Sequence, residues 1–263
     1  MDLGIQNKIA LISASSTGLG REVALVLAEE GAKVIICSRS SNKLRAAANY
    51  IKENAQKEVR FEPCDLTKRS EIENLVSLVI KDFGNIDILI NNSGGPKSGY
   101  FSDFTDRDWL EAFNLNFLST QILTSLVIPH MKKNNFGRIV NITSISAKQP
   151  IDGLILSNGI RAGILGMAKT LANELAPYQI LVNNVCPGYT LTERVKTLSE
   201  TLAKNKNTTP EHIIKEWESS IPLNRLGTPR EFANLVAFLC SNSASYITGT
   251  TIQCDGGAVK SIF

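Results

Sequence analysis

Histidine is scarce in this sequence of 263 residues, which contains only two. His130 and His212 have no cysteine, aspartate or glutamate at the spacing that metal ligands use, so the sequence predicts no metal site and no histidine-based catalytic triad. The five cysteines are an odd number and include no C-x-x-C pair. They are therefore expected to be reduced, mostly buried thiols.

An excess of one charge is also missing. The 28 lysines and arginines nearly balance the 25 aspartates and glutamates, and the net charge of +3 excludes a dominant nucleic-acid-binding surface. No apolar run approaches the roughly 18 residues that span a bilayer, so we expect no membrane partner. The N-terminus lacks a basic stretch followed by an apolar one, which predicts a cytoplasmic protein without a secretory signal.

The sequence instead alternates short β-branched runs with longer segments of helical period, a pattern typical of βαβ units. We expect residues 1–263 to form a single α/β domain, a Rossmann-like three-layer α/β/α sandwich around a doubly wound, seven-stranded parallel sheet. Ligand binding is expected beyond the C-terminal strand ends. The expected strands are residues 8–12, 33–37, 59–63, 86–90, 138–142, 180–185 and 251–254, and the expected helices are 18–30, 41–54, 70–84, 106–132, 151–176 and 229–239.

One stretch departs from this alternation. Residues 191–220 are rich in lysine, glutamate, threonine and asparagine and have weak periodicity. Two interpretations are open, namely a mobile insertion that forms a lid or substrate segment over a site, and a solvated surface excursion.

The first expected strand runs into a turn of small residues directly before the first helix. Such residues let the backbone approach a pyrophosphate, and a helix N-terminus offers unpaired N–H groups and a positive dipole end. The turn therefore predicts a dinucleotide-binding loop, with a tight turn that binds no ligand as the alternative. Its expected cofactor-binding residues are Ser13, Ser15, Ser16, Thr17, Gly18, Leu19 and Gly20.

The end of the second expected strand distinguishes between two dinucleotides. An acidic residue there would hold the ribose 2′-hydroxyl of NAD, but the sequence has Ser38 and Arg39. A guanidinium pairs well with phosphate oxygens, so the pair favours NADP(H) over NAD(H).

Several further blocks together resemble the short-chain dehydrogenase/reductase superfamily, and most closely its β-ketoacyl-acyl-carrier-protein reductase type. Asp-Leu-Thr at 65–67, Asn-Asn-Ser-Gly at 91–94 and Pro-Gly-Tyr-Thr-Leu-Thr at 187–192 each look like a family motif that meets the cofactor. The segment 222–257 is similar to the family's ending, which builds the last strand and a subunit interface, and so implies a homotetramer or homodimer. The cofactor residues that this resemblance implies are Asp65, Leu66, Asn92, Ser93, Gly94, Pro187, Gly188, Thr190 and Thr192.

The sequence departs from the family in its chemistry. The family uses an Asn, a Ser, a Tyr and a Lys, and Asn116 and Ser144 match the first two. The Tyr position holds Ser157, and the Lys position, four residues later, holds Arg161, which is therefore expected both in the catalytic set and at the ribose. The first glycine of the cofactor turn is also replaced, by Ala14, which is strained if that position needs a positive φ.

These replacements leave three functional hypotheses. The first is an NADP(H)-dependent oxidoreductase that interconverts a 3-oxoacyl-like ketone and an alcohol with an atypical catalytic set. Because serine is a poor acid and arginine does not release a proton, this hypothesis needs another proton donor, with Tyr189 ranked before Lys148, Tyr100 and Lys97. The second is a non-catalytic nucleotide-binding pseudoenzyme that acts as a sensor or assembly partner. The third is non-redox chemistry with Ser144 or Ser157 as the nucleophile, although neither lies in a nucleophile elbow.

Overall fold

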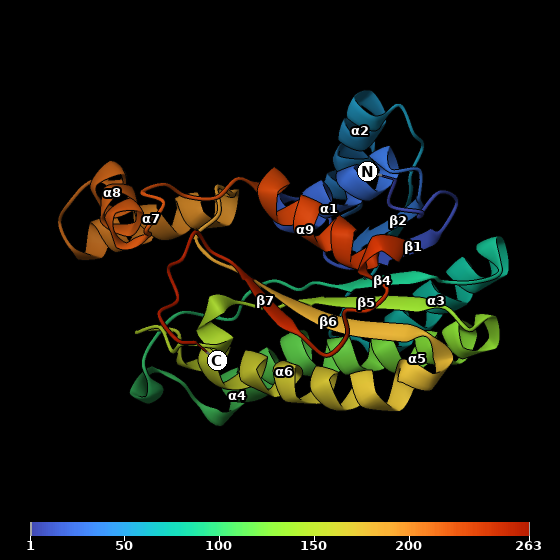
Figure 1. The fold of residues 1–263 in the computed structure, drawn as a ribbon. Coiled ribbons are helices and arrows are strands. Elements are labelled where there is room, and N and C mark those ends of the chain that lie inside the picture. The colour runs from blue at the N-terminus through green and yellow to red at the C-terminus, as the bar shows by residue number, and fades with distance from the viewer. Residues whose placement is uncertain (1, 263) are drawn as a thin grey trace.

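The computed structural model describes residues 2–262, and they form one seven-stranded sheet (Figure 1). All six strand pairs are parallel, and the strand order is β3-β2-β1-β4-β5-β6-β7. The order reverses between β1 and β4, which is the switch point of a doubly wound sheet. The predicted fold class is confirmed. The strands are β1 (Ile9–Ile12), β2 (Lys33–Ser38), β3 (Arg60–Pro63), β4 (Ile88–Asn91), β5 (Gly137–Ile142), β6 (Ile180–Pro187) and β7 (Thr251–Cys254).

Helices cover both faces of the sheet (Figure 1). One face carries α1 (Gly18–Glu29), α2 (Ser41–Ala55) and α9 (Pro229–Cys240), and the other carries α3 (Arg69–Phe83), α5 (Ser119–Asn134) and α6 (Ile155–Leu175). None of the helices in the described part of the chain has the length and apolar character needed to cross a membrane.

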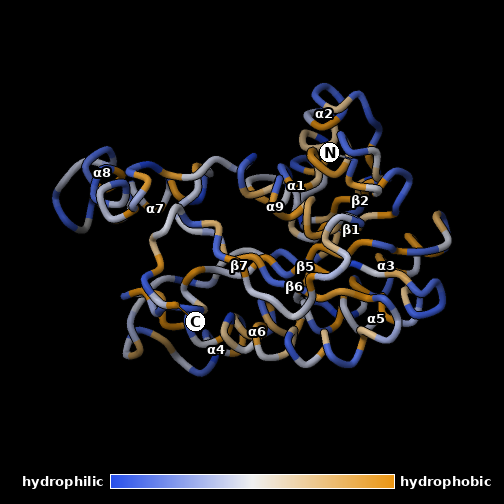
Figure 2. Tube along the Cα trace, viewed as in Figure 1, coloured by the Kyte–Doolittle hydropathy of each residue, from blue (hydrophilic) through white to orange (hydrophobic). Residues whose placement is uncertain are grey.

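Alternate residues of the central strands pack into two separate hydrophobic cores, one on each face of the sheet. In β1, Ala10 and Ile12 pack with α1, α2 and α9, whereas Ile9 and Leu11 pack toward α3 and α5. Because both faces are covered, β1, β4 and β5 are buried along their whole length, as expected of central parallel strands. The hydropathy of the trace shows the same arrangement, with apolar strands inside and polar helix surfaces outside (Figure 2).

A ladder of buried amides crosses the sheet where β4, β5 and β6 end. Asn91 Nδ2 donates to Asn141 Oδ1 over 2.9 Å, and Asn141 Nδ2 donates to Asn184 Oδ1 over 2.9 Å. Asn184 Nδ2 then donates to Thr251 Oγ1 on β7 over 3.0 Å. Each buried amide thereby gains a partner in a neighbouring strand, so the ladder fixes the strand ends from which the adjoining loops leave.

Several predicted boundaries were wrong. The expected helix at 106–132 is divided into α4 (Asp106–Phe113), a π-helical turn at Asn114–Leu118, and α5. The expected helix at 151–176 begins at Ile155, because Ile151, Asp152 and Gly153 form a turn with positive φ at the glycine. Short 3-10 turns lie at Phe101–Asp103, Ile145–Ala147, Ala176–Tyr178 and Asn242–Ala244.

The stretch 191–220 is more regular than its composition indicates. It forms α7 (Glu193–Asn205) and α8 (Pro210–Ser220), each of which is capped at its N-terminus by a threonine side chain. The two helices pack on each other and project from the body of the molecule (Figure 1). Their shared core is small, and most positions of both helices are polar, which explains why the composition indicated an irregular segment; the buried members of the core are Ala203, Ile213, Trp217, Ile221 and Leu226.

Candidate active site

A cavity of about 1000 Å³ opens at the C-terminal ends of the strands, where the sheet topology predicts ligand binding. It runs from the end of β2 past the turn after β1 to the first turns of α6 and α7. Eighteen of the predicted site residues line it, and they are Ser16, Thr17, Gly18, Leu19, Ser38, Arg39, Asp65, Leu66, Asn92, Ser93, Gly94, Ser144, Ser157, Arg161, Pro187, Gly188, Thr190 and Thr192.

The other predicted loop residues hold the turn from behind. The Ser13 hydroxyl donates to the Asn92 carbonyl over 2.7 Å and accepts the Asn92 N–H over 2.8 Å, so it joins the loops after β1 and β4. Ser15 Oγ accepts the N–H of Cys37 over 3.2 Å. A Cβ at Gly20 would lie 2.9 Å from the Ala14 carbonyl oxygen, which explains the glycine as a packing requirement. These three residues shape the turn, and it is their neighbours that face the cavity.

The turn itself presents a helix N-terminus to the cavity. Gly18, the first residue of α1, has a φ of +59°. A Cβ there would lie 3.8 Å from the Thr192 side chain, so α7 begins directly opposite the turn. Ala14 has a φ of +45°, a strained conformation for a residue with a Cβ. The backbone has therefore kept the shape that glycine would favour at this position.

The end of β2 carries a hydroxyl without a partner. Ser38 Oγ is buried and makes no hydrogen bond among the described residues, and Arg39 lies beside it at the edge of the cavity. Asp65 faces the same end of the cavity. Burial opposes ionisation of Asp65, but hydrogen bonds from Thr67 and the charges of Arg39 and Lys68 hold its pKa below the ordinary value. The set offers a cation and a free hydroxyl to a phosphate group.

At the other end, Asn116 lies behind the cavity wall in the π-helical turn. Its Nδ2 donates to Ser93 Oγ over 2.6 Å and to the Gly94 carbonyl over 2.7 Å, while its Oδ1 is buried without a partner. A π-helical turn between two α-helices is often found at functional sites, because it aims a side chain that a regular helix would not. Asn116 therefore fixes the loop after β4.

Three serines gather beside the cavity. Ser144 caps a 3-10 turn, and its Oγ accepts the Ser146 N–H over 3.1 Å. The hydroxyls of Ser146 and Ser157 lie 3.0 Å apart, and both residues are buried. Sequence reasoning missed Ser146, and its only signal was its position two residues after Ser144. Hydroxyls supply the polar contacts where the resemblance leads one to expect a phenol.

Arg161 lies one turn after Ser157 on α6 and is 6% exposed. Its Nη1 donates to the carbonyl oxygens of Ile142 and Thr143, each over 3.1 Å. Burial, with a smaller contribution from the charge of Arg194, lowers the pKa of Arg161 to about 10. Arg161 is therefore still a cation at neutral pH, anchored to the end of β5.

Comparison with known proteins agrees with this geometry. A family model described as Enoyl-(Acyl carrier protein) reductase matches residues 13–259. The chain is 35% identical over 257 residues to the 3-oxoacyl-acyl-carrier-protein reductase FabG of Aquifex aeolicus, covering 98% of this chain and 99% of that protein. It is 35% identical over 254 residues to human dehydrogenase/reductase SDR family member 4, covering 96% and 88%. The chain belongs to the short-chain dehydrogenase/reductase family.

Solved structures of this family superpose closely. The crystal structure of L-sorbose reductase from Gluconobacter frateurii, complexed with NADPH and L-sorbose, matches with a TM-score of 0.95 at 30% identity, and all of both chains is covered. An actinorhodin polyketide ketoreductase variant with NADPH matches with a TM-score of 0.93 at 30% identity, over 97% of this chain and 98% of that one. The predicted enzyme class, an NAD(P)-dependent oxidoreductase, is confirmed, and the non-catalytic alternative is not favoured.

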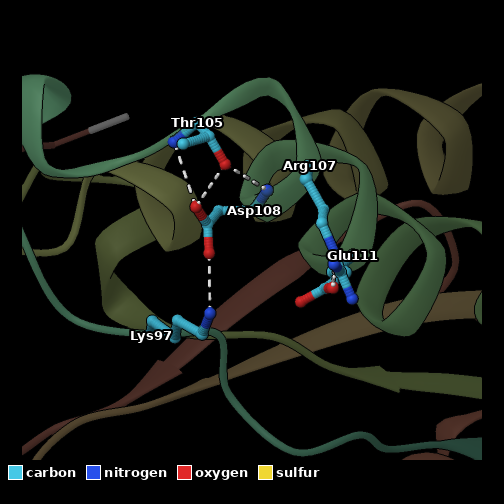
Figure 3. Close-up of polar contacts among 5 residues, drawn as sticks. All are labelled: Lys97, Thr105, Arg107, Asp108 and Glu111. Atoms are coloured by element: carbon cyan, nitrogen blue, oxygen red, sulfur yellow. Dashed lines mark hydrogen bonds and ion pairs between the residues drawn. The ribbon is translucent and has the colours of Figure 1, made fainter.

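Two of the four candidate proton donors lie outside the cavity lining. Lys97 donates to Asp108 over 2.6 Å, and Asp108 also belongs to the capping box with Thr105 at the start of α4 (Figure 3). The hydrogen bond from Lys97 is the largest of the interactions that lower the pKa of Asp108. Lys148 follows the turn Ile145–Ala147. Tyr189 and Tyr100 are the two donors that do line the cavity.

Tyr189 is held by an aromatic contact. Its ring stacks on that of Trp217 from α8, with centroids 4.8 Å apart and an interplanar angle of 11°. Burial raises the pKa of Tyr189, so its phenol keeps its proton at neutral pH. Tyr100, by contrast, is 64% exposed.

No group of three or more histidine, cysteine or acidic side chains among residues 2–262 forms a metal site, and all five cysteines are free.

Proposed function

We propose that this protein is an NADP(H)-dependent reductase that interconverts a 3-oxoacyl-like ketone and the corresponding alcohol with an atypical catalytic set. The observation that carries the cofactor preference is the end of β2, where Arg39 and the unpartnered, buried Ser38 hydroxyl border the cavity. A 2′-phosphate satisfies both groups, whereas a bare ribose hydroxyl leaves the guanidinium without an anion. The NADPH in the matched L-sorbose reductase and polyketide ketoreductase structures supports the same cofactor, and the name of the matched 3-oxoacyl-acyl-carrier-protein reductase supports the ketone substrate.

The remaining cofactor contacts follow from the cavity. The turn at Gly18 and the N-terminus of α1 hold the pyrophosphate, and Arg161 reaches the ribose on the nicotinamide side. Asp65 and Leu66 flank the adenine, and the Pro187–Thr192 stretch meets the carboxamide. When bound, the nicotinamide supplies or accepts a hydride.

The serines orient the carbonyl. Ser144 and Ser157 line the cavity, and their hydroxyls donate hydrogen bonds to the substrate oxygen as negative charge develops there. Arg161 adds a fixed positive charge, but a guanidinium does not give up a proton at working pH. The oxygen must therefore receive its proton from another side chain.

Tyr189 is our assignment for that proton donor. It is a phenol on the cavity wall, protonated at neutral pH and held in one orientation by Trp217. Tyr100 has the same chemistry but lies in an exposed position, where a water molecule competes with the substrate for its hydroxyl.

A titration with NADPH and NADH tests the cofactor preference. We expect Arg39→Ala to weaken NADPH binding by about ten- to a hundredfold and to leave NADH binding unchanged, because only NADPH carries the 2′-phosphate. Arg45→Ala is the matched control, since Arg45 is an exposed arginine of α2 that does not line the cavity. Equal losses for both cofactors would contradict NADP(H) selectivity. Tight binding of NADPH without turnover of any ketone would favour the pseudoenzyme instead.

Assembly and location complete the proposal. The resemblance of residues 222–257 to the family's ending supports a homotetramer or homodimer. We place its action on a small carbonyl or alcohol substrate in the cytoplasm. Light scattering at micromolar concentration checks the assembly, and a monomeric mass would contradict it.

A further inference from the structure

Arg194, the second residue of α7, reaches into the cavity from the side opposite the sheet. Its guanidinium lies directly on Gly95, at a site where a Cβ would collide with all of its terminal atoms. Gly95 follows Asn92, Ser93 and Gly94 in the loop after β4. The side chain therefore spans the cavity from the helical insertion to that loop.

No hydrogen bond or ion pair engages this guanidinium among residues 2–262, and its neighbour Glu193 makes no ion pair with it. Arg60, Arg69, Arg107, Arg225 and Arg230, by contrast, each pair with a carboxylate. Arg194 is exposed to solvent at the cavity, and the atoms packed around it lower its pKa. A cation that lines a cavity without a carboxylate partner is free to pair with the oxygens of an incoming anion.

The surroundings of Arg194 add to this tendency. Its charge acts on Arg161, which is one of the other cations that line the same cavity. Arg194 also lies in the first turn of a helix, where the dipole favours negative charge. These features together favour an anionic occupant of the cavity.

We propose that Arg194 binds an oxyanion inside this cavity and closes the cavity from the α7 side. The proposal rests on the proposed function, because the two sources of such a group are the diphosphate of the dinucleotide and an acidic group on the ketone substrate. The diphosphate is the first source, because Thr192, two residues before Arg194, lies next to Gly18 in the phosphate turn. A substrate carboxylate is the other source, since Arg161 and the serines line the same space. In both cases the planar guanidinium pairs with two oxygens.

The test compares Arg194→Met with Lys196→Met. Lys196 is an exposed cation on the same helix that does not line the cavity, so the control removes the same charge without the proposed contact. The probes are NADPH, inorganic pyrophosphate, and two ketones that differ in one charge, acetoacetate and ethyl acetoacetate. Arg194→Lys shows whether charge alone is enough, and circular dichroism confirms that each variant folds.

We expect Arg194→Met to weaken the binding of one anionic ligand by about ten- to a hundredfold, and Lys196→Met to change that affinity by less than about twofold. Weaker NADPH binding identifies the diphosphate as the partner. An unchanged NADPH affinity, with a raised KM for acetoacetate and an unchanged KM for its ester, identifies a substrate carboxylate.

The proposal is overturned if Arg194→Met and Lys196→Met have the same affinity or KM for every one of these ligands. If the wild-type protein binds no nucleotide, the proposed function fails separately. Thermal stabilisation by pyrophosphate then decides the role of Arg194. Stabilisation of the wild-type protein that is lost in Arg194→Met still supports the oxyanion site, whereas equal stabilisation of all variants rejects it.

Discussion

The two ends of the cavity lie on one sheet edge but resemble the family motifs to different degrees. At the β2 end, the phosphate turn and Asp65 resemble the family motifs, and Ala14 has a positive φ where the resemblance leads one to expect a glycine. At the α6 end, Ser157 and Arg161 stand where the resemblance leads one to expect a tyrosine and a lysine. Both side chains are nevertheless well satisfied, the first by Ser146 and the second by two carbonyls.

This difference separates binding from proton transfer. Most contacts that hold a dinucleotide come from backbone and helix N-termini, which tolerate side-chain change. Proton transfer depends on the acidity of one group, and the aliphatic hydroxyl of Ser157 is a much weaker acid than a phenol. The α6 end is therefore expected to control turnover and the β2 end affinity.

The largest effect is expected from placing the family's tyrosine and lysine at positions 157 and 161, which tests whether turnover and affinity are controlled separately. We expect Ser157→Tyr with Arg161→Lys to raise ketone reduction by about a hundredfold, because a positioned general acid contributes at least that much. Ser157 lines the cavity, so the added ring has space on that side. Steady-state kinetics with a small ketone gives the rate, and NADPH titration is expected to show unchanged affinity. A double variant that loses the wild-type turnover would mean that the Ser157–Arg161 pair is itself the working set.

Removing the proposed proton donor has the next largest effect. Tyr189→Phe keeps the stacking on Trp217 and deletes only the hydroxyl, so we expect kcat to fall by about a hundredfold without a change in NADPH affinity. Wild-type reduction is expected to fall as the pH rises toward about 10, because Arg161, with a pKa of about 10, loses its charge there, whereas the raised pKa of Tyr189 keeps its phenol protonated below that pH. Tyr100→Phe is the companion variant. A larger loss in that variant would transfer the assignment to Tyr100.

The sequence was sufficient to predict the sheet and most of the cavity wall, because both depend on short-range patterns. Buried parallel strands appear as apolar runs, and the motifs after β1, β3, β4 and β6 all converge on one edge by topology. The positions of Gly20 and Ser13 behind the turn could not be predicted in the same way. Their contacts join residues almost eighty positions apart or depend on the path of the turn, and a single sequence does not show such distances.

The α7–α8 pair was missed for a different reason. Its apolar residues face a core of five buried side chains shared between two helices and the following loop, and most of its other positions are polar or charged, so the composition resembles that of an irregular surface segment. Arg194 was missed as well, because the feature that distinguishes it is the lack of a carboxylate partner among residues 2–262. Whether a charged side chain has such a partner is visible only in the folded molecule.

The smallest expected effect tests the backbone shape of the phosphate turn at the β2 end. Ala14→Gly removes a Cβ at a φ of +45°, which costs roughly 1–2 kcal/mol in an L-residue, against an unfolded-state entropy term of about 0.5–1 kcal/mol. We expect a net stabilisation of about 0.5–1 kcal/mol, seen as a rise of a few degrees in Tm. Gln179→Gly makes the matched change at a φ of +54° on an exposed turn away from the cavity. Both variants are expected to gain stability while NADPH affinity stays constant, because the turn already has its binding shape. If Ala14→Gly also tightened NADPH by tenfold, the alanine would be distorting the turn, and the two ends of the cavity would both have departed from the family.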